Sequence, residues 1–302
     1  MIGFIFVITA CALWAVDTLI RYPLLQSDGL NALTIVFYEH LLLSVILFVI
    51  SFKSLKNFKR FNKSHIIYFF LVGGVGSALS TLAFTNAFRF LNPSLVILLQ
   101  KFQPVFAILL ARSFLKEKIK PIFIFWAIIC LIGGVLVSYE DIMSLRSTPK
   151  GVSELLFHPG AFQGYILVLF SVLGWGAATV FGKKLVNLGY SDEQILSGRF
   201  QFGLFCLIPF VILNNEPIFN DNLEVYSKIA LMVLISGLLA MYLYYQGLRK
   251  LSARACSLTE MFFPLMAVIV NWIFLDAILT PVQIVGGAIL VTGSVIIQLK
   301  KY

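Results

Sequence analysis

The sequence predicts an all-α integral membrane protein with ten transmembrane helices, arranged as two inverted repeats of five helices. Three features support this prediction: the composition, the charge of the loops and an internal repeat. Of the 302 residues, 60% are hydrophobic and 12% are charged, and the mean hydropathy is +0.94. Soluble domains contain about 45–50% apolar and about 25% charged residues. The excess of apolar residues requires lipid, and the segments between the predicted helices leave no room for a soluble domain.

Hydropathy divides the chain into ten apolar segments, each near the roughly 20 residues that span a bilayer as a helix. The first has no basic leader and no small-residue cleavage site, so we expect it to be retained as a helix. Pro121 and Pro281 begin two segments, where a missing N–H costs no hydrogen bond. The segments are Ile2–Leu25, Asn31–Phe52, Ile66–Phe88, Ser94–Leu115, Pro121–Tyr139, Ala161–Val186, Asp192–Leu213, Lys228–Leu248, Ala255–Leu275 and Pro281–Leu299.

Lysine and arginine gather in alternate loops, the pattern that orients membrane proteins. Of the 23 such residues, 15 lie at 53–63, 116–120, 183–184, 249–254 and 300–301, and only 5 lie on the other side. Because positive loops stay in the cytoplasm, both termini are predicted to be cytoplasmic, in a multi-pass protein of the bacterial inner membrane. The same pattern explains the net charge of +9 without a nucleic-acid partner.

An offset of 160 residues brings the two halves of the chain into register. Arg89 then falls on Arg249, Pro104 on Pro264 and Pro121 on Pro281. The predicted units are a first repeat at 1–140, a periplasmic linker at 141–160 and a second repeat at 161–302. Each repeat holds an odd number of helices, so the second enters the membrane upside down. Many secondary transporters have this plan, with the substrate site near the midplane between the repeats.

Two stretches carry a resemblance to a known family. They are AFRFLNPSLVILLQKFQPVFAILLARSFLKEKIKP at 87–121 and GLRKLSARACSLTEMFFPLMAVIVNWIFLDAILTP at 247–281, and each has a mid-helix proline and an acidic residue after the helix. With ALWAVDT and LGWGAAT in the first helix of each half, the whole chain resembles the EamA-type ten-helix branch of the drug/metabolite transporter superfamily. The resemblance implies export or exchange of amino acids, nucleosides, cofactors or drugs, often linked to protons.

The chain also departs from that pattern. The family often has an arginine in the second helix of a half, and Arg199 matches it, but the first half has Glu39 there. Asp17 and Lys101 within helices are not general features either. Specificity is therefore not transferred from any relative.

Ionisable residues at membrane depth cost about 2.5–3.5 kcal/mol or more and usually face a partner or a wet cavity. Asp17, Glu39 and Lys101 share an outer layer, and Arg199 and Glu260 share an inner one. One hypothesis is that Glu39–Lys101 and Arg199–Glu260 are ion pairs that act as gates. In a second, these charges and Asp17 bind a charged substrate or a proton. In a third hypothesis, the ion pairs only hold helices together, although a buried ion pair is weak evidence for stability.

Aromatic residues and prolines complete the candidate site. Trp14 and Trp175 occupy matching positions and either stack on a substrate or pack in the core, and Tyr245 is a candidate cavity wall. On the first helix Asp17 and Arg21 are spaced to pair along one face. Pro104 and Pro264 remove backbone hydrogen bonds and are predicted to kink their helices beside the cavity.

These observations favour a secondary transporter that moves a small polar or zwitterionic metabolite, an amino acid or a nucleoside-like cofactor, by alternating access. An intramembrane enzyme or a passive channel is the alternative, although the common catalytic and nucleotide-binding motifs are missing from the sequence. The expected partners are the substrate, the bilayer, and protons or a counter-substrate, for a monomer or a homodimer. We expect no cofactor and no metal, because the histidines are scattered and the four cysteines form no CxxC pair.

Overall fold

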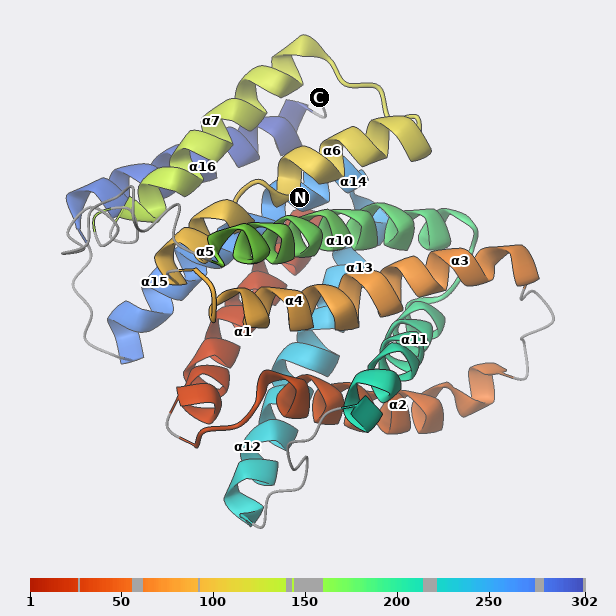
Figure 1. The fold of residues 1–302 in the computed structure, drawn as a ribbon. Coiled ribbons are helices and arrows are strands. Elements are labelled where there is room, and N and C mark those ends of the chain that lie inside the picture. Colours follow the sequence, from red (N-terminus) through yellow and green to blue (C-terminus); the bar gives the residue numbers. More distant parts are fainter. Residues whose placement is uncertain are drawn as a thin grey trace.

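The computed structural model describes residues 1–26, 28–55, 62–91, 93–139, 143, 160–213, 222–274 and 280–300, and these are almost entirely helical (Figure 1). The first half contains α1 Ile2–Gln26, α2 Ala32–Leu55, α3 Ile66–Phe69, a π-helical segment η3 Phe70–Leu79, α4 Ser80–Ala87, α5 Pro93–Gln100, α6 Gln103–Phe114 and α7 Pro121–Val137. The second contains α10 Ala161–Asn187, α11 Asp192–Leu213, α12 Leu223–Met232, a π-helical segment η4 Val233–Ala240, α13 Met241–Lys250, α14 Ala253–Glu260, α15 Phe262–Phe274 and α16 Pro281–Lys300.

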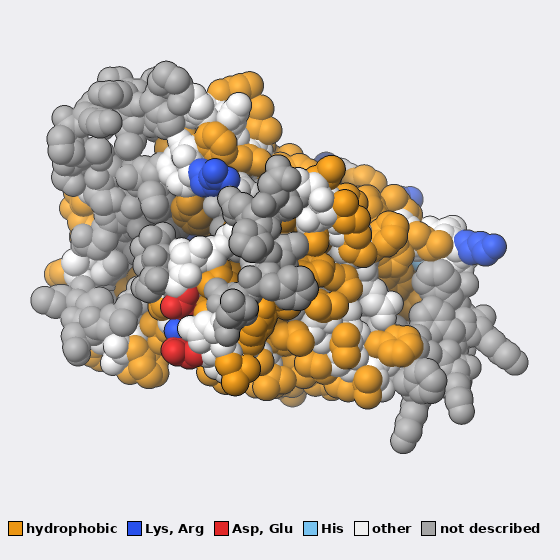
Figure 2. Space-filling model, turned by 60° about the horizontal axis from the view of Figure 1, so that its bottom comes forward, with side chains coloured by type: hydrophobic (Ala, Val, Ile, Leu, Met, Phe, Trp, Pro, Cys, Tyr) orange, Lys and Arg blue, Asp and Glu red, His pale blue; other side chains and the backbone are white. Residues whose placement is uncertain are grey.

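Among the residues that the structure describes, eight helical stretches are long and apolar enough to cross a membrane, and α6 and α7 are shorter apolar helices. Large apolar side chains remain exposed along these helices, among them Phe162, Phe205 and Leu213 at 71–79% of their full surface. Figure 2 shows apolar side chains over much of the part of one face that the structure describes. A soluble monomer rarely exposes apolar patches of this extent. The fold is thus an all-α membrane protein whose outer surface suits lipid.

Two helices are interrupted near the prolines that the sequence predicts to kink them. The first break, at 101–102, separates α5 from α6 and precedes Pro104, and the second, at Met261, separates α14 from α15 and precedes Pro264. Tighter turns bridge both breaks, because Phe102 N bonds Leu99 O at 3.1 Å and Met261 N bonds Leu258 O at 3.2 Å. Proline cannot donate the next helical hydrogen bond, and its ring crowds the preceding turn.

Two other long helices each contain a π-helical segment in the middle, η3 and η4. Such segments are rare and occur often at functional sites. In η3, a Cβ on Gly73 would collide with the backbone of Arg199, so glycine allows α11 to lie directly against this helix. The glycine at this position therefore serves close packing of the two helices.

The helices α7 and α16 lie side by side at one edge of the molecule (Figure 1). Each of the two helices has a glycine that makes the close contact possible. A Cβ on Gly133 would lie 2.7 Å from Leu290 N, and one on Gly293 would lie 2.8 Å from Cys130 Sγ. The four cysteines are free.

The centre of the molecule is built around α1 and α10. The helix α1 packs against η4, α13, α14 and α15, all from the other half, and α10 packs against η3, α4 and α6. Each long first helix thus contacts the half to which it does not belong. The predicted linker 141–160 lies outside the described residues apart from Met143 and Gly160.

Candidate functional site

The carboxylate of Glu260 is the centre of the candidate site. It lies at the end of α14, directly before the break at Met261. Three neutral side chains donate to it: Gln103 Nε2 to Oε2 at 2.7 Å, and Tyr244 Oη at 2.9 Å and Thr179 Oγ1 at 3.0 Å, both to Oε1. The helix break thus presents a well-bonded carboxylate within the bundle.

The donors to Glu260 come from three different helices. Thr179 lies on α10 and Tyr244 on α13, and their hydroxyl oxygens lie 2.9 Å apart. Gln103 is the first residue of α6, so it reaches Glu260 from the first half of the chain. Both Thr179 and Tyr244 are buried, at 2% and 4% exposure. The site therefore joins the two halves through a single carboxylate.

Aromatic rings flank this carboxylate. Trp14 lies against Tyr244 with ring centroids 5.6 Å apart, and its Nε1 donates to Ser236 O at 3.3 Å. Trp175 precedes Thr179 by one helical turn and packs against Phe84 at 4.9 Å. Both tryptophans are only partly buried. A flat ligand beside Glu260 would find aromatic surface within reach.

A second polar cluster lies on α1 and α2. Arg21 Nε is 2.7 Å from Asp17 Oδ2, and Arg21 Nη2 is 3.2 Å from Glu39 Oε2. Ser236 Oγ also donates to Asp17 Oδ1 at 2.6 Å. The predicted pairing of Asp17 with Arg21 along one helical face is confirmed. This cluster holds both of its carboxylates with one guanidinium.

The two predicted gate pairs are not formed. Glu39 pairs with Arg21, from the neighbouring helix, instead of Lys101, which is buried at the break between α5 and α6. Among the described residues, no ion pair within 4.0 Å joins Arg199 to Glu260, which is held by neutral donors. The depth estimate placed each pair in one layer, but depth along a helix says nothing about which side faces which neighbour.

Arg199 and Tyr245 lie close to the Glu260 cluster. Arg199 is within electrostatic reach of both Glu260 and Tyr245. Arg199 Nε and the Tyr245 hydroxyl are buried, and within the described residues neither makes a hydrogen bond of good geometry, although the guanidinium and the hydroxyl lie close enough to interact with each other. A buried polar atom left without a partner costs about 1–3 kcal/mol. A ligand with acceptor oxygens would supply hydrogen bonds of good geometry.

Two stretches of the chain, residues 1–139 and 162–299, match the model of the EamA-like transporter family. The chain belongs to this family. The resemblance seen in the sequence is thereby confirmed, and the chain is a multi-pass membrane transporter.

Similar proteins align with nearly the whole chain. A Fusobacterium nucleatum protein named riboflavin transporter ImpX is 32% identical, over 99% of this chain and 97% of its own. An uncharacterized transporter of Clostridium kluyveri is 24% identical, over 97% and 92%. A protein of known crystal structure superposes with a TM-score of 0.76 at 14% identity, covering 98% of this chain and 96% of the other, which shows a shared fold.

Sequence reasoning singled out Glu260 but missed the partners that hold it in this EamA-like transporter. Gln103, Thr179 and Tyr244 are uncharged, so the cost of burying charge in lipid did not mark them. One signal was present, because Thr179 follows Trp175 by one helical turn in the repeated motif of each first helix. Among the described residues, no group of three or more His, Cys, Asp or Glu side chains is placed to hold a metal ion.

Glu117, the acidic residue of the family-like pattern, has a structural position. Its carboxylate accepts the N–H groups of Ala253 at 2.8 Å and Arg254 at 3.3 Å, at the start of α14. Arg254 Nε lies 3.5 Å from the same carboxylate. A carboxylate at a helix N-terminus satisfies free N–H groups and favours the helix dipole. Glu117 thus anchors the helix that carries Glu260.

Proposed function

We propose that this transporter is a secondary carrier for a nucleoside-like metabolite, with riboflavin as the first candidate, and that it works by alternating access in the bacterial inner membrane. The observation that carries the proposal is the Glu260 carboxylate held by neutral donors beside the aromatic pair of Trp14 and Tyr244. The name of the relative at 32% identity points to the same class of substrate.

The chemistry of a flavin ring suits the residues of this site. The ring is flat, carries an imide N–H that a carboxylate accepts, and has carbonyl oxygens that accept from donors. Glu260 provides the carboxylate, and the buried Arg199 guanidinium and Tyr245 hydroxyl provide further donors nearby. Stacking of a flat ring on an aromatic side chain contributes about 1–3 kcal/mol. An amino acid or another zwitterion would use the same acid and the same base.

The proposal includes ten spans in two repeats related by a two-fold axis in the membrane plane. Contacts that recur with the halves exchanged support it, because an isologous contact always has a mate with both partners swapped. At offsets of 160–161 residues, three contacts recur in this way. The contact Trp14–Tyr244 recurs as Trp175–Phe84. The contact Gly133–Leu290 recurs as Gly293–Cys130, and Gly3–Leu251 recurs as Gly164–Leu91. The breaks before Pro104 and Pro264 also match at this offset.

Glu260 has no acidic counterpart in this scheme. The offset of 160 places it on Gln100, Tyr244 on Phe84 and Gln103 on Phe263. The proposed substrate site therefore departs from the symmetry of the scaffold around it. Such a departure is expected where a scaffold of two similar halves binds an asymmetric molecule near the midplane.

Counterflow in proteoliposomes tests the proposal. Vesicles containing the purified protein are loaded with unlabelled riboflavin, and uptake of labelled riboflavin is compared with that of empty vesicles. A carrier is expected to show transient accumulation that depends on the loaded substrate. Equal uptake by loaded and empty vesicles would indicate a passive channel, and conversion of the label would indicate an enzyme.

Repeating the assay with labelled and loaded nucleosides or amino acids in place of riboflavin, and with an imposed pH gradient, separates the remaining possibilities. Acceleration by nucleosides alone would support a nucleoside-like substrate and exclude riboflavin as that substrate. Acceleration by amino acids alone would contradict the flavin assignment. A response to an imposed pH gradient would identify protons as the coupling ion, and preloaded vesicles measure exchange and export in the same assay.

A further inference from the structure

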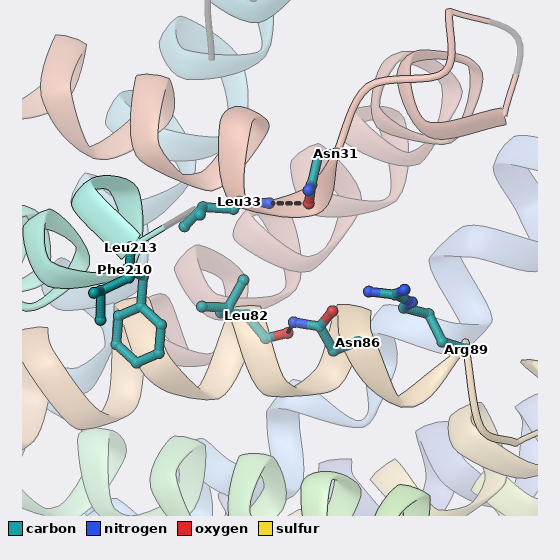
Figure 3. A pocket seen from close by; sticks show the side chains of 7 residues that line it. All are labelled: Asn31, Leu33, Leu82, Asn86, Arg89, Phe210 and Leu213. Carbon is teal, nitrogen blue, oxygen red and sulfur yellow. Dashed lines mark hydrogen bonds between the residues drawn. The ribbon is translucent and has the colours of Figure 1, made fainter. Parts of the chain in front are cut away.

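A pocket of about 270 Å³ opens at the end of the bundle where α1 leads into α2, which the loop charges predict to face outward. It lies apart from the Glu260 site, between the start of α2, the end of α4 and the end of α11 (Figure 3). Its lining side chains are Asn31, Leu33, Leu82, Asn86, Arg89, Phe210 and Leu213. The Arg89 side chain is exposed and has no ion-pair partner within 4.0 Å in the described part of the chain.

The opposite end of the bundle contains the positions that match this pocket, and there the space is filled by a carboxylate. Asp192, 5% exposed at the start of α11, lies 2.6 Å from Arg249 Nη2 and 3.1 Å from Arg249 Nε. Gln246 Nε2 donates to its other oxygen at 2.5 Å. This end of the second half thus holds an oxyanion with a guanidinium and an amide.

The repeat offset of 160 residues places Asp192 on Ala32, Arg249 on Arg89 and Gln246 on Asn86. The guanidinium and the amide are therefore present at both ends, and only the carboxylate is lacking at one. Ala32 is the first residue of α2, as Asp192 is the first residue of α11. The pocket lies where an acidic side chain at position 32 would be expected to reach.

We propose that this pocket binds an external oxyanion, a phosphate or a carboxylate, in the place of the carboxylate that position 32 lacks. Arg89 provides the charged contact, because a guanidinium forms the strongest paired hydrogen bonds to such groups. Asn86 now donates to Leu82 O at 3.0 Å through Nδ2, and its second amide hydrogen is available to the anion. The inference rests on the repeat of the proposed function for its equivalence of positions.

The apolar part of the lining restricts the kind of anion. Leu33, Leu82 and Phe210 form one side of the pocket, and its volume exceeds that of a bare phosphate. The ligand is therefore an oxyanion joined to an apolar or aromatic body. A phospholipid headgroup and a soluble organic phosphate both have this chemistry, and inorganic phosphate presents the anion alone.

Thermal unfolding of the purified protein in a neutral detergent tests the site without any transport. The probes are inorganic phosphate, riboflavin 5′-phosphate and short-chain phosphatidylglycerol, each titrated at constant ionic strength. At least one is expected to raise the Tm of the wild-type protein saturably, by about 3 °C or more. The probe that acts identifies the source of the anion, headgroup or soluble phosphate.

Two variants and a control decide whether Arg89 and position 32 form the site. Arg89→Gln is expected to weaken the response at least about tenfold in apparent Kd, because it removes the only cation among the described lining residues. Ala32→Asp is expected to raise the Tm without any probe and to abolish the response, as its carboxylate pairs with Arg89. Arg112→Gln changes an exposed arginine at the opposite end and is expected to respond as the wild type.

A wild-type protein that responds to none of the three probes would overturn the proposal, and so would an Arg89→Gln variant that responds as the wild type. If Ala32→Asp fails to fold, Arg89→Gln alone still decides. Because no transport is measured, this inference can fail while counterflow succeeds, and the reverse also holds.

Discussion

The two polar clusters of this EamA-like transporter hold carboxylates within the bundle by different means. At Asp17 and Glu39, one guanidinium, Arg21, contacts both acids directly. At Glu260, the side chains that contact the carboxylate directly within the described residues are neutral donors. A carboxylate fixed by a cation has its charge compensated in place, whereas one held by neutral donors keeps its charge for a ligand or a proton. We infer that the first cluster serves stability and the second serves transport.

The largest expected effect is on stability and comes from Arg21→Gln. This change leaves two partly buried carboxylates without their cation, and breaking a buried pair by removing one partner costs about 3–5 kcal/mol. The free energy of unfolding in detergent micelles is expected to fall by about 3 kcal/mol. Adding Asp17→Asn and Glu39→Gln to the same chain is expected to restore most of it. An Arg21→Gln protein as stable as the wild type would remove the distinction between the clusters.

Glu260→Gln is expected to lower transport without lowering stability, the reverse of Arg21→Gln. The amide keeps the shape of the side chain and removes the charge, so the unfolding temperature should stay the same or rise. Transport of the accepted substrate is expected to fall about thirtyfold, equivalent to about 2 kcal/mol, because a charge-assisted hydrogen bond contributes about 1.5–3 kcal/mol. Counterflow and thermal unfolding measured on the same preparation check both parts.

Glu224→Gln is the matched control for Glu260→Gln. Glu224 has the same side chain, and 67% of that side chain is exposed at the start of α12. It is expected to change neither counterflow nor unfolding measurably, because exposed ion pairs contribute about 0–1 kcal/mol. Equal loss of transport in both variants would indicate a general electrostatic effect and not a site at Glu260.

Much of the scaffold follows from local sequence. The apolar segments, the breaks before Pro104 and Pro264 and the pairing of Asp17 with Arg21 depend on residues a few positions apart, and the structure contains them. The contact of Arg21 with Glu39 does not, because it depends on how α1 and α2 rotate against each other. Charge alone marked Glu39 as a candidate without identifying its partner.

The partners of Glu260 were the least predictable part of the site, because they too depend on how the helices pack against one another. Its donors Gln103 and Thr179 are 157 and 81 positions away in the chain, on helices that the tertiary packing brings together. A polar uncharged residue is tolerated at membrane depth, so its burial gives no sequence signal. The repeat marks Thr179, whose mate at the offset of 161 is Thr18, but it does not reveal Gln103, whose mate at the offset of 160 is Phe263.

Trp14→Ala tests whether the aromatic wall belongs to the transport cluster. The ring packs on Tyr244 and its indole N–H donates to Ser236 O. The apparent KM for the accepted substrate is expected to rise about tenfold, equivalent to about 1.4 kcal/mol, within the range of base–aromatic stacking. Trp14→Phe, which keeps a flat ring, is expected to recover most of this loss. A KM unchanged in Trp14→Ala would assign the ring to packing.

Tyr244→Phe is expected to cause the smallest loss of transport, and it tests a single donor to Glu260. It removes one of the three donors to Glu260 and keeps the ring against Trp14. Since a neutral hydrogen bond contributes about 1 kcal/mol, transport is expected to fall about fivefold. The matched change Tyr226→Phe removes a hydroxyl that lies 3.4 Å from that of Tyr38, away from Glu260. If Tyr226→Phe loses as much transport as Tyr244→Phe, the hydroxyl acts through folding. If only Tyr244→Phe loses transport, the donors around Glu260 tune the carboxylate that the substrate meets.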